Sequence, residues 1–338
     1  MISAVDFGLT DIQAAKTRIQ GVADNTPLIP SPFVTNVSGH DFLMKMELMQ
    51  PIGAFKLRGA MSAVMALPER VKGVTCCSTG NHGRGVAYAA RLRGMKAVIC
   101  MSELVPQAKV DGIKALGADV RIIGTSQDEA MAESQRLCDA EGLVEISPFD
   151  DPHVVAGQGT IGLEIMEKRP DLATILVPLS GGGLAAGVAV AAKALSPGIK
   201  VIGITMDRGA AMYASIQAGH PVEVPEFPSL ADSLGGGIGL ENKLSYPLCR
   251  DLLDDTILVS EDEIHHAMQV MFFEDRIVAE GASVVGIAAI MSGKFKPTGP
   301  TATIVTGRNL DMPTFLAIMA GENVQIGDLT VKGRRYGT

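Results

Sequence analysis

The sequence lacks tryptophan, and aromatic residues make up only 4% of its 338 residues. Cysteine is also scarce: the five cysteines are odd in number, and no pair has the Cys-x-x-Cys spacing of a zinc or redox motif. These features argue against a disulfide scaffold and against a zinc site, so we expect no bound metal. Cys76, Cys77 and Cys100 lie in apolar runs, where buried thiols are common, and they indicate a reducing, cytoplasmic compartment.

Basic clusters and long apolar runs are also rare in the sequence. The net charge is −8, and one basic cluster, Lys332–Arg335, lies near the end of the chain, so nucleic acid is not expected as a partner. Hydrophobic residues reach 47%, but they are spread over many short runs, which is typical of buried strands and helices rather than of a membrane span. The first residues lack a basic region followed by an apolar segment, so no signal peptide is predicted.

Short apolar runs alternate with segments of helical periodicity along most of the chain. One series of strand-like runs and helical segments extends from about residue 74 to residue 146, and a second extends from about 154 to 305. Each strand is almost entirely apolar, as in parallel sheets that helices cover on both faces. We therefore predict an α/β fold with two open, mostly parallel sheets covered by helices. The residues after Glu322 carry no strong pattern.

One lysine is distinguished by its position. Lys56 follows the loop signals Pro51 and Gly53 and precedes a helical pattern, so we expect it in the first turn of a helix. Burial and the partial positive charge of a helix start both disfavour an ammonium ion, which would make Lys56 a neutral amine nucleophile. The alternative is an exposed first-turn lysine, the commoner situation for any single lysine.

Two strand-to-helix turns are unusually polar or rich in glycine. The first, Ser78-Thr-Gly-Asn-His-Gly83, combines backbone N–H groups at a helix start with hydroxyl and amide side chains. A helix cap needs one such residue rather than four in a row, so the turn favours a carboxylate-binding site.

The second turn, Ser180–Gly187, has three successive glycines before a helix, which predicts a phosphate-binding cradle. It also matches the dinucleotide fingerprint Gly-x-Gly-x-x-Ala at Gly181, Gly183 and Ala186, with Asp207 beyond the next strand. A nicotinamide-dependent dehydrogenase is therefore an alternative, although it would leave the lysine and the polar turn without a role.

A third turn, Thr306-Gly-Arg-Asn309, follows the last apolar strand. In an open parallel sheet, ligands bind at the C-terminal ends of the strands, where all three turns fall. An amine nucleophile, a phosphate cradle, a carboxylate site and a hydroxyl group together fit one cofactor, pyridoxal 5'-phosphate.

With these motifs, the sequence resembles the fold-type II pyridoxal-phosphate enzymes of the serine/threonine dehydratase and serine racemase group, whose fold is like that of the tryptophan synthase β chain. Its markers are five motifs in the family's order, namely Gly53-Ala-Phe-Lys-Leu-Arg-Gly59, Ser78-Thr-Gly-Asn-His-Gly83, Ala156-Gly-Gln-Gly-Thr160, Ser180-Gly-Gly-Gly-Leu184 and Ala231-Asp232. The turns Ser78–Gly83 and Thr306–Asn309 look most like those of hydroxyectoine-utilisation dehydratases. The resemblance implies a homodimer, a large cofactor-binding domain of residues 1–70 and 151–338, and a small mobile domain of residues 71–150.

The resemblance also implies how the cofactor is held. Lys56 would form the internal aldimine and move the α-proton, Phe55 would pack beside the ring, and Asn81 would hydrogen-bond the phenolic oxygen. Thr306 would face the ring nitrogen, and a neutral hydroxyl there leaves that nitrogen largely unprotonated, which favours elimination. The phosphate would be bound by the backbone of Gly181, Gly182, Gly183 and Leu184.

For the substrate, the resemblance implies an amino acid that loses its β-hydroxyl group as water and is then hydrolysed to a keto acid and ammonia. The residues expected to hold its carboxylate are Ser78, Thr79, Asn81 and His82. Thr79 stands where the family's racemases have an acid/base serine, and its methyl group would crowd that face of the cofactor. Racemisation therefore ranks below elimination as an alternative.

Two further departures from the family pattern concern charge. Thr205 stands where cation-binding members have a glutamate, so we expect no metal site of that kind. Arg308 stands where glycine is usual, which suggests that it meets a second polar or anionic group on a substrate such as 3-hydroxyaspartate or a hydroxyectoine-derived amino acid. Arg84 is interpreted as a surface residue. A non-catalytic regulator that has kept a degenerate cofactor fold is the alternative outside enzymes.

Overall fold

The computed structural model describes residues 4–78, 80–103, 105 and 107–337, and its larger sheet has six strands in the order β1-β2-β10-β7-β8-β9. All neighbouring strands in this sheet are parallel except β1 and β2. The bounds are Leu28–Pro30 (β1), Phe42–Lys45 (β2), Thr301–Ile304 (β10), Thr174–Pro178 (β7), Lys200–Met206 (β8) and Asp255–Val259 (β9).

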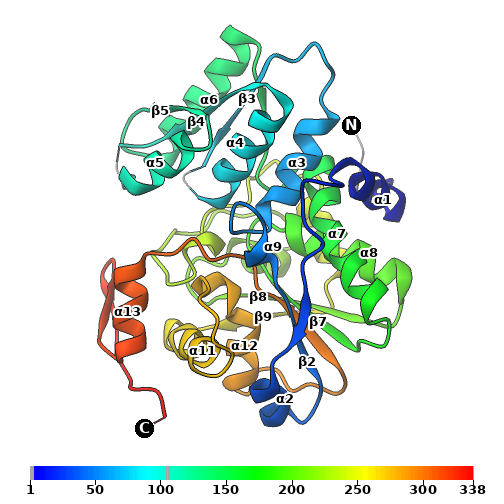
Figure 1. Ribbon diagram of the computed structural model, residues 1–338, viewed down its shortest axis with the longest axis vertical. Coiled ribbons are helices and arrows are strands. Elements are labelled where there is room, and N and C mark those ends of the chain that lie inside the picture. The colour runs from blue at the N-terminus through cyan, green and yellow to red at the C-terminus, as the bar shows by residue number, and fades with distance from the viewer. Residues whose placement is uncertain (1–3, 79, 104, 106, 338) are drawn as a thin grey trace.

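A second sheet has four parallel strands in the order β5-β4-β3-β6. It lies at the opposite end of the molecule from the six-stranded sheet (Figure 1). Its strands are Gly73–Cys77 (β3), Lys96–Met101 (β4), Asp119–Ile122 (β5) and Val144–Glu145 (β6). The predicted α/β fold with two mostly parallel sheets is therefore confirmed.

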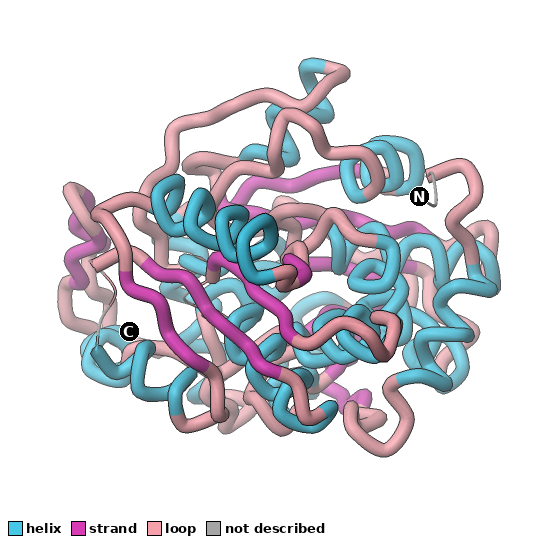
Figure 2. Tube along the Cα trace, turned by 90° about the horizontal axis from the view of Figure 1, so that it is seen from above, coloured by secondary structure: helices cyan, strands magenta, loops and turns pink. Residues whose placement is uncertain are grey.

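Helices cover both faces of the sheets, and Figure 2 shows helices around the strands when the molecule is seen from above. The α-helices are Leu9–Arg18 (α1), Pro32–Ser38 (α2), Lys56–Ala66 (α3), Asn81–Arg93 (α4), Gln107–Lys114 (α5), Gln127–Glu141 (α6), Pro152–Lys168 (α7), Gly183–Leu195 (α8), Ala211–Ala218 (α9), Ser245–Leu252 (α10), Glu261–Phe273 (α11), Val285–Met291 (α12) and Met312–Ala320 (α13). Three short 3₁₀ helices are Glu47–Met49 (η1), Asp232–Leu234 (η2) and Gly281–Ser283 (η3).

Alternating side chains of the strands explain why helices are needed on both faces. In β7, Ile175 and Val177 pack in one hydrophobic cluster with α7 and α8, whereas Leu176 packs in another with α11 and α12. In the smaller sheet, Cys76 joins a cluster with α3 and α4, and the next residue, Cys77, joins a cluster with α6. A strand that is buried on both faces has to be apolar throughout, which is the pattern seen in the sequence.

The end of the chain forms structure that the sequence did not indicate. After α13, the strands Val324–Ile326 (β11) and Leu329–Val331 (β12) pair as an antiparallel hairpin. Val324, Ile326 and Val331 are buried in the cluster that contains α11 and α12, so three apolar side chains hold a segment that lacks strong periodicity. Within the described chain, no helix is both long and apolar enough to cross a lipid bilayer.

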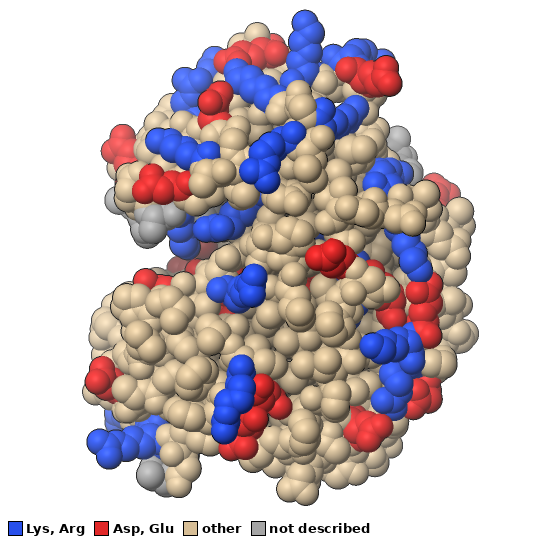
Figure 3. Space-filling model, viewed as in Figure 1, with Lys and Arg blue, Asp and Glu red and all other residues tan. Residues whose placement is uncertain are grey.

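A hollow opens between the two ends of the molecule, and the space-filling view shows Lys and Arg side chains along its wall below α5 (Figure 3). The ion pair between Lys109 of α5 and Asp232 of η2, at 3.7 Å, connects the two sides. The C-terminal ends of β2, β3, β7 and β10 lead into the turns singled out in the sequence.

Candidate active site

The predicted lysine begins helix α3, and its turn is attached to the turn after β10. Strands β2 and β10 are parallel neighbours, so the segments that follow them lie side by side. The N–H of Phe55 donates to the carbonyl of Thr306 at 2.9 Å, and Ala54 forms an isolated β-bridge with Gly307. Two motifs that are 250 positions apart in the chain are thereby joined by backbone hydrogen bonds.

The amine of Lys56 has no carboxylate partner among the described residues. Its Nζ donates to the carbonyl oxygen of Pro148 at 2.8 Å and lies 5.5 Å from the centroid of the Phe55 ring. Burial lowers the pKa of Lys56 from 10.5 to about 8, which agrees with the direction expected from the sequence. A lysine in this setting supplies an appreciable fraction of neutral amine near neutral pH.

Asn81 is the first residue of α4 and belongs to a buried polar network. Its Nδ2 lies 3.0 Å and 3.1 Å from the two carboxylate oxygens of Glu280, and its Oδ1 accepts from Asn309 Nδ2 at 2.7 Å. The N–H of Asn309 also donates to Glu280 Oε1, at 2.7 Å. Burial raises the pKa of the Glu280 carboxyl above its ordinary value.

The hydroxyl group of Thr306 is buried beside that of Ser283, with 3.0 Å between the two oxygens. Ser283 Oγ also accepts from the N–H of Gly307 at 2.8 Å and lies 2.9 Å from the carbonyl oxygen of Gly307. Thr306 therefore presents a neutral hydroxyl group in a hydrogen-bonded pair, and no charged side chain is bonded to it in the described structure.

The glycine turn after β7 has the geometry of an anion cradle. Gly182 has φ of 88°, a left-handed conformation that suits glycine, and α8 begins at the next residue. The N–H groups of Gly182, Gly183 and Leu184 have no acceptor within the described residues. Unpaired N–H groups at a helix start bind phosphate readily, so the turn fits a phosphate group.

The segment that leads into α7 closes over this turn. A side chain at Gly181 would collide with Phe149, because a Cβ atom there would lie 2.1 Å from the ring atom Cδ1. Asp150 accepts from the N–H groups of Leu244 and Ser245, both at 2.9 Å, and Ser245 Oγ donates to the carbonyl of Gly181 at 2.7 Å. The glycine turn is thus held from two sides.

The polar turn after β3 is only partly described. Thr79, for which we expected a catalytic and substrate-binding role, lies outside the described residues. Ser78 is half-buried, and its Oγ is 3.4 Å from the N–H of Gly80. In this contact the Ser78 oxygen accepts a hydrogen bond, so the contact does not occupy the hydroxyl proton of Ser78.

His82, one of the residues expected to hold the substrate carboxylate, has its side chain engaged elsewhere. The residue is 3% exposed, and its Nε2 lies 2.7 Å from the carbonyl oxygen of Ile146. Because a carbonyl can only accept, Nε2 carries the ring hydrogen. Burial lowers the pKa of His82 to about 3, so the ring is neutral and its one N–H is already used. Its backbone N–H remains the group that it can offer to a substrate.

The two arginines next to the motifs differ in their surroundings. Arg84 is half-buried against α5, where a Cβ atom at Gly112 would lie 2.5 Å from its Nη2. Arg308 is exposed on the Thr306 turn; its backbone N–H donates to the carbonyl of Gly53 at 3.0 Å. No ion pair of the Arg308 guanidinium is present in the described part of the chain.

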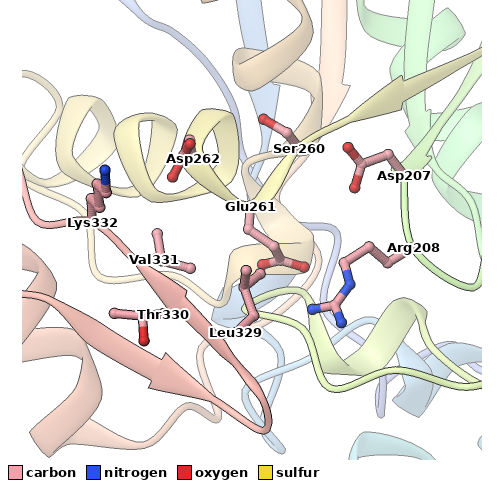
Figure 4. Close-up of a pocket in the computed structure, with 9 residues that line it drawn as sticks. All are labelled: Asp207, Arg208, Ser260, Glu261, Asp262, Leu329, Thr330, Val331 and Lys332. Carbon is pink, nitrogen blue, oxygen red and sulfur yellow. The ribbon is translucent and has the colours of Figure 1, made fainter.

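Asp207, the residue that a dehydrogenase would use for ribose, lines another cavity. This cavity of about 510 Å³ lies at the ends of β8 and β9 and is walled by the C-terminal hairpin (Figure 4). No residue of the glycine turn lines it. Thr205 is buried in β8, and no cluster of metal-binding side chains is present among the described residues.

The sequence did not reveal the roles of four groups at the site. They are the side chains of Glu280, Ser283 and Asn309 and the backbone carbonyl of Pro148. Glu280 carried a usable signal, because it is a single carboxylate within the otherwise apolar and small residues 277–291. Such a residue is expected to be buried with hydrogen-bond partners. Asn309 was quoted within a motif but was given no role, and a backbone carbonyl leaves no signal at all.

Comparison with known proteins agrees with this site. Residues 19–307 match the family model described as pyridoxal-phosphate dependent enzyme. A putative threonine dehydratase of Sinorhizobium fredii is 51% identical over 319 residues, covering 94% of this chain and 96% of that protein. An L-threonine ammonia-lyase of Thermotoga maritima is 38% identical over 306 residues, covering 90% and 76%. The solved structure of maize serine racemase has a TM-score of 0.87 at 34% identity, covering 93% and 97%.

The chain therefore belongs to the pyridoxal-phosphate dependent enzymes, and its cofactor is pyridoxal 5'-phosphate. Within this family it is a lyase that catalyses β-elimination. Family membership excludes the nicotinamide-dependent dehydrogenase, and the similarity to a threonine dehydratase and an ammonia-lyase argues against the non-catalytic regulator. The Lys56 amine, the glycine cradle and the Thr306 hydroxyl fit the aldehyde, the phosphate and the ring nitrogen of the cofactor.

Proposed function

We propose that the protein removes water and then ammonia from a β-hydroxy-α-amino acid that carries a second anionic or polar group. The observation that carries this proposal is Arg308, an exposed cation on the Thr306 turn whose guanidinium has no ion-pair partner in the described structure. Substrates of this class are 3-hydroxyaspartate and the amino acids derived from hydroxyectoine.

Bound pyridoxal phosphate supplies a ring that withdraws electrons from the substrate Cα. In this proposal, Lys56 Nζ holds the cofactor and takes the Cα proton, for which its lowered pKa of about 8 suits it. Asn81 Nδ2 donates to the phenolic oxygen, and Phe55 packs beside the ring. The N–H groups of the glycine cradle hold the phosphate.

The substrate carboxylate is held by the polar turn, through the Ser78 and Thr79 hydroxyl groups and the backbone N–H groups of Asn81 and His82. Thr306 provides a neutral hydroxyl at the ring nitrogen, which supports elimination rather than a long-lived carbanion. Racemisation, which would need a second acid/base group such as Thr79, remains the lower-ranked alternative and is detected in the same experiment.

The test is a substrate panel of threonine, serine, 3-hydroxyaspartate and hydroxyectoine-derived amino acids, with ammonia release, keto-acid release and the enantiomeric composition of the remaining amino acid as the readouts. For an anionic substrate, Arg308→Ala should lower kcat/KM by about 10- to 100-fold, because a charge-assisted hydrogen bond is lost. For threonine, the change should stay within about twofold, because its side chain carries no second charge for Arg308 to meet. Arg84→Ala is the matched control.

Equal kinetics of wild type and Arg308→Ala on every substrate would disprove the specificity role of Arg308. Formation of the D-enantiomer at a rate comparable to ammonia release would favour the racemase alternative instead.

A further inference from the structure

Glu280 is a buried carboxylate that the proposed mechanism does not use. It directly precedes η3 and is 3% exposed. Asn81 Nδ2, the N–H of Asn309 and Ser233 Oγ point at it, at 3.0, 2.7 and 3.5 Å. No ion pair of Glu280 with a lysine or arginine is present in the described residues. A buried carboxylate without a cation is costly unless hydrogen-bond donors offset its desolvation, so these three donors have to do so.

The Thr306 turn leaves space for this carboxylate. At Gly307, a Cβ atom would lie 2.6 Å from Glu280 Oε1, so a side chain at this position would displace the carboxyl group. The N–H of Glu280 in turn donates to the carbonyl of Gly307 at 3.0 Å. The close approach of Glu280 therefore explains why the second position of the Thr-Gly-Arg-Asn motif is a glycine.

The hydrogen bonds of Asn309 show which way the Asn81 amide faces. Asn309 Nδ2 lies 2.9 Å from the carbonyl oxygen of Ile52, which can only accept, so the NH2 group of Asn309 is on that side. The same NH2 group lies 2.7 Å from Asn81, so Asn81 must present its oxygen there. The NH2 group of Asn81 then faces Glu280.

The Asn81 amide therefore donates to Glu280 and accepts from Asn309. Glu280 receives one hydrogen of Asn81 Nδ2, shared between its two oxygens at 3.0 and 3.1 Å. The second hydrogen of Asn81 Nδ2 has no acceptor in the described structure. This second hydrogen is the one that Asn81 would offer to the phenolic oxygen of the cofactor.

We propose that Glu280 is a positioning residue that holds the Asn81 amide in the orientation in which Nδ2 donates to the cofactor's phenolic oxygen. The proposal rests on the role of Asn81 in the proposed function. It concerns the binding of the cofactor and not the choice of substrate. Glu280 itself touches neither the cofactor nor the substrate in this account.

The test measures the Kd of pyridoxal phosphate for the full-length apoprotein and the pH dependence of the absorbance of the bound cofactor without substrate. Glu280→Leu, which cannot accept a hydrogen bond, should weaken cofactor binding about 10-fold and shift the absorbance titration. Glu280→Gln should bind the cofactor within about twofold of wild type. Its side-chain oxygen can still accept from Asn81 and Asn309, and its amide can donate to Ser233.

A double-mutant cycle separates positioning from a direct effect. In the Asn81→Ala background, Glu280→Leu should cause no further loss of affinity, because the residue that it positions is gone. An undiminished 10-fold loss in that background would overturn the proposal. The matched control is Glu261→Gln, a buried glutamate on α11 that should leave both readouts unchanged.

The remaining outcomes are also decisive. If Asn81→Ala weakens cofactor binding and Glu280→Leu does not, the positioning proposal alone is wrong. If Asn81→Ala itself has no effect, the cofactor contact assigned to Asn81 is wrong as well. Should Glu280→Leu fail to fold, Glu280→Ala replaces it, with the same expected loss of about 10-fold in the wild-type background and no further loss in the Asn81→Ala background.

Discussion

Lys56 and Arg58 lie two residues apart at the start of α3, in opposite electrostatic surroundings. Arg58 is 1% exposed and is paired with Glu47 through Nε at 2.8 Å and with Glu164 through Nη1 at 2.7 Å. Lys45 pairs with Glu164 in the same place, so Lys45, Glu47, Arg58 and Glu164 form a buried ionic cluster with no net charge. Lys56 has a backbone carbonyl and an aromatic ring as its neighbours.

The difference shows how one helix serves both stability and chemistry. Positions i and i+2 of a helix point to roughly opposite sides, so α3 separates the ionic cluster from the cofactor site. Burial acts to lower the pKa of Arg58, but Glu47 and Glu164 outweigh it and raise that pKa. Burial without such partners lowers the pKa of Lys56 to about 8. The presence or absence of a carboxylate decides which cation stays charged.

The largest effect is expected from breaking the ionic cluster. Arg58→Met should lower the free energy of unfolding by about 3–5 kcal/mol, because the buried Glu47 loses its ion-pair partner and Glu164 keeps only Lys45. The measurement is urea unfolding of the apoprotein. Lys16→Ala, which removes an exposed ion pair with Glu167, is the control and should cost no more than about 1 kcal/mol. Equal losses of unfolding free energy in the two variants would show that the buried cluster stabilises the protein no more than an exposed ion pair does.

A smaller effect of opposite sign is expected at Lys56. The unfolded chain binds more protons at this residue between pH 8 and 10.5, so its destabilising contribution is full below pH 8 and fades as the pH rises. Lys56→Met should therefore stabilise the apoprotein at pH 7, and the gain should shrink towards pH 10. Urea unfolding of both proteins at the two pH values measures this difference. A gain that is independent of pH would contradict the lowered pKa.

Much of the fold could be predicted from local patterns, because buried parallel strands are apolar throughout and the site turns follow them directly. The glycine turn Gly181–Leu184 follows strand β7, and Lys56 begins a helix, both as the local patterns predicted. The orientation of His82 could not be foreseen, because it depends on the carbonyl of Ile146, a residue that follows β6 and is 64 positions away in the chain. The β11–β12 hairpin escaped prediction since a few buried residues, rather than a periodic pattern, hold it.

Several expectations remain predictions. They are the division into residues 1–70 with 151–338 and a mobile unit of residues 71–150, the homodimer, and the roles of the individual site residues. Glu280 and Asn309 teach a general point about such sites. Residues that touch the cofactor tend to lie in motifs, whereas residues that orient them come from other parts of the chain and are recognised only through their contacts.

The most direct test of the account is borohydride reduction of the holoenzyme, followed by proteolysis and mass spectrometry. The account predicts that the cofactor is fixed covalently to the peptide that contains Lys56, and that Lys56→Ala abolishes both this labelling and keto-acid release. Fixation on another lysine, or unchanged labelling of Lys56→Ala, would contradict the central claim that the unpaired lysine of α3 holds the cofactor.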